Sequence, residues 1–277
     1  MHRLPSRSSR RSEDYDLRSV IIHSESPHNL KTIRDSVSLL KKITHPLRIC
    51  IREFPRRRLS DSEPSSLIKL RLINPVKRDE RAIDSFALRE FERRVMMGAA
   101  KPRGVPYEGL GLMAFYRNLI PEAERIFPEF HIIITDRLIM SWDEDESKYH
   151  ARVILFGIPS IISMSGLVEA PARAREYYIA RQVADSIGIK NPLAARSFSG
   201  DFLEFDDGRI PFVLRGYLLQ CIFYAMTGNP FCSNRDCMLF NAHWQEEMLH
   251  AQIESGRLCA HHRRELNERL SRLRPGS

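Results

Sequence analysis

Short stretches of alternating apolar and polar residues, together with longer amphipathic stretches, indicate the secondary structure expected of this chain. Alternation over residues 47–51 and 68–72 predicts two half-buried strands. Apolar residues at helical spacing between residues 79 and 97 predict a surface helix that ends at Gly98. A core helix is predicted where apolar residues recur along one helical face, at Leu214, Leu218, Cys221, Ile222 and Ala225.

Proline, glycine and acidic residues mark the ends of further elements. Residues 113–127 are expected to form a helix with a break at Pro121, because proline lacks the backbone N–H that a helix interior needs. A second helix is expected over residues 171–187, with proline at its first position and Gly188 at its end. The acidic residues 143–146 predict a solvated turn, since they lack the glycine and the distant glutamate of a calcium-binding loop.

Length and composition set the outer limits of the fold. The chain has 277 residues, of which 43% are hydrophobic, and this is enough for one sizeable domain. Residues 1–45 are expected to form a basic, partly disordered segment, because the first residues are rich in arginine and serine, and the domain is expected to span residues 46–273. No apolar run approaches the roughly 20 residues that cross a bilayer, and no secretory signal is visible, so we expect no membrane partner and a cytoplasmic location.

The strongest chemical signal lies near the C-terminus, within residues 228–266. Three of the five cysteines and a histidine lie there in two short segments, namely Cys232, Cys237, Cys259 and His262. Zinc is bound tetrahedrally by thiolates and imidazoles, and cytoplasmic thiols stay reduced, so these four residues predict a closed, structural Cys3His zinc site. Two points stay open: the adjacent His261 could replace His262, and the cysteines could be ordinary core thiols that bind no metal.

The order of these residues resembles the signature of the archaemetzincins, a metallopeptidase family found in archaea and elsewhere. That signature reads His-Glu-x-x-His-x-x-Gly-x-x-His-Cys, four residues, Cys-x-Met and a later Cys-x-x-Cys; its histidines hold a catalytic zinc and its cysteines a structural zinc. The matching residues here are Gly228, Cys232, Cys237, Met238, Cys259 and His262. Met238 follows Cys237 one residue early, and a histidine replaces the closing cysteine. The resemblance implies an α+β, metzincin-like single domain with a mixed sheet, long helices and a structural Zn²⁺ site.

The same register gives no complete catalytic site. Cys221, Ala225 and Phe231 stand at the three histidine positions, and Ile222 stands at the glutamate. A catalytic zinc needs about three protein ligands and an open position for water, and that water needs a general base. Only Cys221 could bind a metal. The resemblance therefore implies a non-catalytic pseudopeptidase or binding protein, with a peptide or protein as its ligand.

Three strands extend this resemblance over roughly residues 67–266. Residues 130–136 resemble the central strand of the family, which ends in an Ile-Thr-Asp turn. Residues 152–157 and 161–165 resemble the paired strands that line the substrate cleft and precede the long helix. The sequence does not determine whether the cleft beside this pair is still open.

A second hypothesis is an active hydrolase with a relocated metal site built on His243, Glu247 and His250. Their spacing places them on one side of a predicted helix, and two histidines with a carboxylate are adequate for zinc catalysis. However, the apolar residues Trp244 and Met248 between them indicate an amphipathic helix, whose polar face would carry such residues without any metal. The pattern favours the simpler reading, an amphipathic helix without a metal.

A third hypothesis is a zinc-stabilised protein that associates with nucleic acid. The formal net charge is +8 and the computed pI is about 9.4, and arginines are frequent beside the predicted zinc site, at Arg263, Arg264, Arg269 and Arg272. Such a protein would bind phosphates with an affinity that falls as salt rises. A solvated helix face explains the same arginines, and no aromatic stacking motif accompanies them. The sequence does not determine the oligomeric state.

Overall fold

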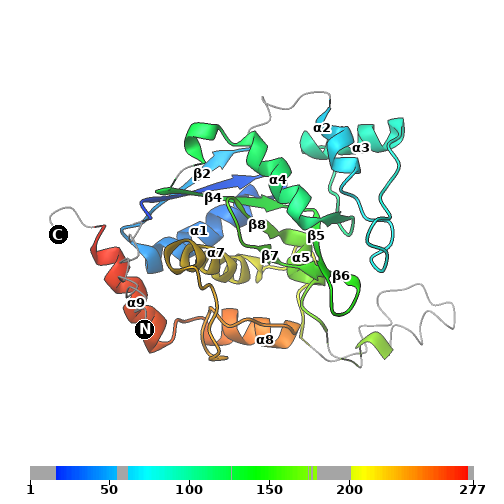
Figure 1. The fold of residues 1–277 in the computed structure, drawn as a ribbon. Coiled ribbons are helices and arrows are strands. Elements are labelled where there is room, and N and C mark those ends of the chain that lie inside the picture. Colours follow the sequence, from blue (N-terminus) through cyan, green and yellow to red (C-terminus); the bar gives the residue numbers. More distant parts are fainter. Residues whose placement is uncertain are drawn as a thin grey trace, which may run out of the picture.

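The computed structural model describes residues 17–54, 62–125, 127–173, 175, 177–179 and 201–273, which form a single mixed α/β domain built on two sheets (Figure 1). The larger sheet has the order β2-β1-β4-β8-β7 and contains β1 (Ser19–Ser24), β2 (Arg48–Glu53), β4 (Glu129–Thr135), β7 (Ile154–Leu155) and β8 (Ser160–Ser163). Its strands are parallel except for β7, which runs antiparallel to β8 at one edge. The smaller sheet has the order β3-β5-β6 and contains β3 (Pro106–Glu108), β5 (Leu138–Asp143) and β6 (Lys148–Arg152).

Helices cover both faces of the larger sheet. Helices α1 (Leu30–Thr44) and α7 (Ile210–Thr227) lie on one face, and α4 (Gly109–Leu119) lies on the other (Figure 1). Because successive side chains of a strand point to opposite faces, Ile132 of β4 joins the core under α1 and α7, whereas Ile133 joins the core under α4. The other helical elements are η1 (Pro27–Asn29), α2 (Glu63–Ile68), α3 (Phe86–Met96), η3 (Glu122–Glu124), α5 (Met164–Glu169), α8 (Gln245–Leu249), the π-helix η5 (His250–Ser255) and α9 (Ala260–Ser271).

Helix α7 is the core helix that the sequence predicts. Leu214, Leu218 and Ile222 are fully buried, as expected of a helix that is apolar on nearly all sides. Pro211 lies in its first turn, and it ends at Gly228, whose φ of +74° is a left-handed conformation that glycine adopts without a Cβ penalty. Contrary to the expectation from the sequence, this helix is long and apolar enough to cross a membrane by length and composition, but 67% of that stretch is buried inside the fold, as in a core helix.

Strands occur in the three segments that resemble family strands, with somewhat different bounds. Residues 130–135 lie in β4, the middle strand of the larger sheet, which ends before Asp136. The predicted pair corresponds to the antiparallel neighbours β7 and β8, but Arg152 belongs to β6, and residues 164 and 165 begin α5. The strand predicted over residues 47–51 falls on β2. Residues 144–147 form the turn of the β5–β6 hairpin, as the acidic run predicts.

The predicted N-terminal boundary of the domain needs correction. Strand β1 lies between β2 and β4 in the sheet, and Ile33 and Leu40 of α1 are fully buried in the core. Residues 17–45 therefore belong to the domain, which does not begin at residue 46. All six residues of β1 are buried, so this strand shows no alternation of apolar and polar residues by which it could be recognised. The expected disorder of the first twelve residues lies outside the described residues.

The strand predicted over residues 68–72 is wrong. Helix α2 extends to Ile68, and beyond it only single bridges occur, from Arg71 to Tyr107 and from Leu72 to Arg81. Ile68 is fully buried at the end of the helix and Leu72 is buried at a bridge. The alternation therefore arose from two different structures in succession.

Two predicted helices have different limits in the structure. The helix expected over residues 79–97 is α3, which begins only after Ser85, whose hydroxyl accepts a hydrogen bond from the N–H of Leu88 and so caps the first turn. The helix expected over residues 113–127 is α4, which begins at Gly109 and ends before Pro121. Of the helix expected over residues 171–187, residues 175 and 177–179 are described and helical, but Ala172 forms a bridge with Trp244, so the helix does not begin at Pro171; residues 180–187 lie outside the described residues.

A buried ion network joins the larger sheet to α3. Arg137, which follows β4, is completely buried and donates hydrogen bonds to Glu25 at 3.0 Å and to Glu92 at 2.6 Å. The hydroxyl of Tyr107 donates to Glu92 at 2.6 Å, and its ring lies 4.6 Å from the Arg137 guanidinium. Burial alone would lower the pKa of Arg137, but Glu25 and the other acidic neighbours hold it well above its ordinary value.

A pair of buried histidines connects β1 and β4. The Nε2 atom of His23 lies 3.1 Å from Nδ1 of His131, and the two rings are stacked with centroids 5.3 Å apart. The Nε2 of His131 lies 3.0 Å from the carbonyl of Glu124, which can only accept, so His131 donates there and accepts from His23. Burial, and next the neighbouring His131, lowers the pKa of His23 to about 4, and burial lowers the pKa of His131 as well.

Acidification from about pH 7 to about pH 4.5 is expected to destabilise the fold through His23. Its folded pKa of about 4 lies below the unfolded value of 6.5, so the unfolded chain takes up the proton first. The stabilisation is complete above pH 6.5 and decreases as the pH falls towards 4, by up to about 3 kcal/mol in total. Urea unfolding at a series of pH values measures this. A His23→Gln protein should show a flatter pH dependence, and an unchanged dependence would contradict the assignment.

Candidate metal centre and adjoining cavity

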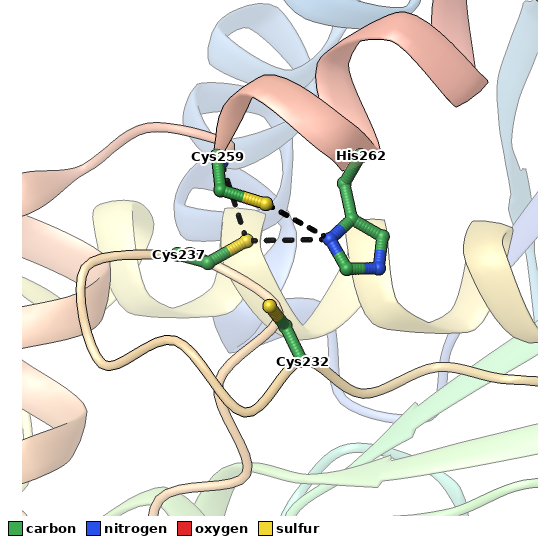
Figure 2. A group of neighbouring side chains, drawn as sticks. All are labelled: Cys232, Cys237, Cys259 and His262. Atoms are coloured by element: carbon green, nitrogen blue, oxygen red, sulfur yellow. Dashed lines mark hydrogen bonds between the residues drawn. The ribbon is translucent and has the colours of Figure 1, made fainter.

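Two segments that are distant in sequence bring the predicted zinc ligands together at the end of α7. The left-handed Gly228 ends α7, and the chain then loops back so that the N–H of Cys232 donates to the carbonyl of Leu239 at 2.8 Å. Cys237 lies within this loop. The second segment starts α9, with Cys259 at its N-terminal cap and His262 in its first turn. The four side chains converge between the loop and this helix (Figure 2).

The geometry of these four residues, here named the Cys3His group, fits one tetrahedral metal ion. Their potential ligand atoms all lie within 4.8 Å of one another. The Nδ1 atom of His262 is 3.1 Å from the sulfur of Cys259 and 3.9 Å from that of Cys237 (Figure 2). Tetrahedral zinc ligands lie roughly 3.5–3.8 Å apart, given Zn–S bonds of about 2.3 Å and Zn–N bonds of about 2.0 Å. The sulfurs therefore lie within reach of a common atom.

The structure distinguishes between the two adjacent histidines. His262 is buried and directs its Nδ1 at the sulfurs, with the ring of Phe223 packed against it at 5.5 Å. The side chain of His261 is 67% exposed, and its Nε2 faces Glu265 at 3.9 Å. His262 is therefore the histidine that belongs to the Cys3His group.

Burial and neighbouring groups shift the pKa values of three members of the Cys3His group. Burial raises the pKa of Cys237 to about 12, so an ion bound there must displace its proton. Burial would also raise the pKa of Cys259, but hydrogen bonds, first of all from the backbone N–H of His262, lower it overall, because the N-terminus of α9 favours a thiolate. Burial, and next the adjacent His261, lowers the pKa of His262. A thiolate and a neutral imidazole are the forms that bind zinc.

Gln252 holds the loop that carries Cys237 through a side-chain hydrogen bond to its backbone. The Nε2 of Gln252, in the π-helix η5, donates to the carbonyl of Met238 at 2.8 Å, next to Cys237. Gly216 of α7 provides the space, since a Cβ there would lie 1.5 Å from Oε1 of Gln252. The closing segment is attached too, because the N–H of Met238 donates to the carbonyl of Arg257 at 2.8 Å. Hydrogen bonds therefore fix the backbone on both segments that carry the Cys3His group.

The residues proposed for a relocated active site do not converge. Oε2 of Glu247 accepts from the backbone N–H groups of His243 and Trp244 and so caps α8. His250 lies between two other carboxylates, with Nδ1 2.7 Å from Glu254 and Nε2 2.7 Å from Asp236. Among the residues that the structure describes, His243, Glu247 and His250 form no group with metal-binding geometry.

The positions that correspond to the catalytic histidines and glutamate lie in or beside the core. Cys221 and Ile222 are fully buried, and burial raises the pKa of the Cys221 thiol far above its ordinary value. Ala225 packs against the core. Phe231 packs edge-on against Phe156, which follows β7, with centroids 5.5 Å apart. The positions that hold the catalytic residues in the archaemetzincin signature are therefore occupied here by buried or apolar side chains.

A cavity of about 310 Å³ lies beside one of these positions, Phe231. It lies between the edge strand β7, α7 and residues 240–243, and its lining includes Arg152, Ile154, Leu155, Tyr217, Gln220 and Phe231. The lining contains one arginine and one histidine, His243, and no aspartate or glutamate. Arg152 lies in the segment that resembles a cleft-lining strand, but no motif singles out its side chain or that of Gln220, because β6 and α7 are far apart in the chain.

The basic residues of α9 are partly neutralised. Arg264 lies 3.9 Å from Glu268 and Arg269 lies 3.9 Å from Glu265, each one helical turn apart. A shallow hollow of about 650 Å³ beside the Cys3His group is lined by arginines, but also by Asp236 and Glu268. Acidic and basic side chains therefore both line this hollow, and the nucleic-acid hypothesis stays a prediction.

Comparison with known proteins gave one match. A protein-family model described as Probable metallopeptidase family (DUF6775) matches residues 17–269. The matched region runs from β1 into α9 and includes the whole Cys3His group. No curated protein and no solved structure matches the chain.

Proposed function

Because the chain belongs to a probable metallopeptidase family, we propose that it is an archaemetzincin-like member that binds a structural zinc and recognises peptides without hydrolysing them. The observation that carries this proposal is the convergence of the Cys3His group at the end of α7, where the archaemetzincin signature expects structural-zinc ligands. Cys232, Cys237, Cys259 and His262 would hold the ion. Bound there, it would cross-link the loop after α7 to α9 and so contribute to folding.

The side chains at the catalytic positions of the signature support the proposal that the protein does not hydrolyse peptides. Hydrolysis by a zinc-bound water needs open coordination and a general base close to the substrate. In the archaemetzincin register, Ile222 and Ala225 can supply neither, and the cavity lining contains no carboxylate. What this region offers instead is an apolar recess along the edge strand of a sheet, and extended peptides bind by adding a strand to such an edge.

Purified full-length protein is expected to contain about one tightly held zinc per chain and to leave peptides uncut. Atomic absorption after dialysis gives the metal content, and mass spectrometry of a tryptic casein digest incubated with the protein reports new cleavages. Thermolysin serves as the positive control. New cleavages that disappear in a Glu247→Gln variant would overturn the proposal in favour of the relocated hydrolase.

A further inference from the structure

The cavity beside β7 is lined by an arginine, Arg152, that has no ion-pair partner among the residues that the structure describes. Arg152 ends β6 and is half-buried at the cavity, where its Nε donates to the hydroxyl of Ser141 at 2.7 Å. Among the residues that the structure describes, no carboxylate lies within ion-pair distance of Arg152, although Arg152 is one of several groups that lower the pKa of Asp143 on the neighbouring strand. The guanidinium has five N–H donors, so it can still bind both oxygens of an incoming carboxylate.

A second polar group at the same cavity is incompletely satisfied. The Nε2 of Gln220 donates to the carbonyl of Phe240 at 3.3 Å, and both residues line the cavity. Because a carbonyl can only accept, this contact fixes the amide orientation and identifies Oε1 as the other end. Oε1 is buried and has no hydrogen-bond partner in the described part of the chain. Because this oxygen is shielded from solvent, Gln220 forms part of the cavity wall and is not a direct contact for a ligand.

The position of β7 sets the direction in which a peptide would lie. Ile154 and Leu155 form the outer edge of the larger sheet and line the cavity, and Arg152 lies two residues before them. A peptide that pairs antiparallel with β7 would end near Arg152 with its C-terminus. A cavity of about 310 Å³ is at the lower end of ligand pockets, which suits one apolar side chain and its backbone.

We infer that this cavity recognises the free C-terminus of a peptide whose last residue is apolar. The α-carboxylate binds Arg152, and the last side chain occupies the recess near Phe231, which Gln220 helps to line. This inference rests on the proposed peptide-binding function and gives it a ligand class, namely peptide carboxylates rather than internal peptide segments.

Binding of three short probes to the full chain tests the inference. The probes are acetyl-Gly-Gly-Phe with a free carboxylate, the same peptide as its carboxamide, and acetyl-Gly-Gly-Ala with a free carboxylate. Nuclear magnetic resonance titration is expected to give about tenfold tighter binding for the Phe acid than for its amide, because one charge-assisted hydrogen-bond pair is lost. The Ala acid should also bind more weakly, since its side chain leaves the recess unfilled.

Substitutions of arginines test whether Arg152 causes the preference for the peptide with a free carboxylate. Arg152→Gln should reduce the affinity for the Phe acid to that for the amide, whereas Arg152→Lys should keep part of the preference because it keeps the charge. Arg81→Gln is the matched control: Arg81 also donates to a hydroxyl, that of Tyr149 at 2.8 Å, but does not line the cavity, so the preference for the acid should persist.

The possible outcomes separate this inference from the proposed function. Equal binding of the acid and the amide to the unaltered protein would overturn recognition of the carboxylate and leave peptide binding standing. Loss of the preference in Arg81→Gln as well as in Arg152→Gln would overturn the role of Arg152. If none of the probes binds, both the inference and the proposed peptide binding fail. Cleavage of a bound probe would overturn only the non-hydrolytic part.

Discussion

Cys237→Ser is expected to lose its zinc and to unfold the region around the end of α7 and the start of α9. Cys237 is fully buried, and its sulfur faces Nδ1 of His262. Serine does not replace a zinc thiolate, and the free energy of a structural zinc, about 10–16 kcal/mol in zinc-finger peptides, is largely folding free energy. Losing even part of it is comparable with the whole stability of a domain, about 5–15 kcal/mol. Zinc content after dialysis and the urea midpoint of unfolding measure the two effects.

The control for this experiment is Cys50→Ser. Cys50 is a partly exposed thiol on β2 and does not belong to the Cys3His group, so its replacement should leave the zinc content and the unfolding midpoint unchanged. A chelator should reproduce the effect of Cys237→Ser on the unaltered protein. A zinc content in Cys237→Ser equal to that of the unaltered protein would contradict the metal assignment, as would cooperative unfolding of a metal-free protein at an unchanged midpoint.

Arg137→Met is expected to lower the free energy of unfolding by about 3–5 kcal/mol. The substitution leaves the carboxylates of Glu25 and Glu92 buried without the guanidinium that neutralises them both. An unpaired buried charge costs far more than the pair itself contributes, so the loss exceeds that of an ordinary core substitution. The network joins the ends of β1 and β4 to α3, and the helix should become less protected when it breaks. Urea unfolding gives the free energy, and hydrogen exchange of α3 amides reports the local effect.

Arg78→Met is the matched control for this prediction. Arg78 pairs with Glu144 at 2.9 Å, but both side chains are more than half exposed, so solvent screens their attraction. Its removal should leave the free energy of unfolding unchanged within error. A triple variant, Arg137→Met with Glu25→Gln and Glu92→Gln, should recover part of the loss because no buried charge remains. Equal effects of Arg137→Met and Arg78→Met would contradict the account of the buried network.

The elements predicted correctly are those whose burial leaves a pattern in the sequence. Alternation marks β2, which is buried on one side only, and apolar residues at helical spacing mark α7. Strand β1 was missed because it is covered on both faces and reads as a short apolar run. The false strand at residues 68–72 has the opposite cause, since a helix end and an isolated bridge together imitate alternation.

For the site, the sequence alone determined the residue types and the spacing of the Cys3His group, because zinc chemistry restricts the ligands to thiolates and imidazoles in closely spaced pairs. Only the tertiary structure decided that His262, and not His261, joins the cysteines, since that depends on which face of α9 packs against the loop. The presence of the cavity beside β7 is also evident only from the tertiary structure. Arg152 of β6 and Gln220 of α7 line the same cavity beside the edge strand β7, and such proximity between elements far apart in the chain leaves no local pattern.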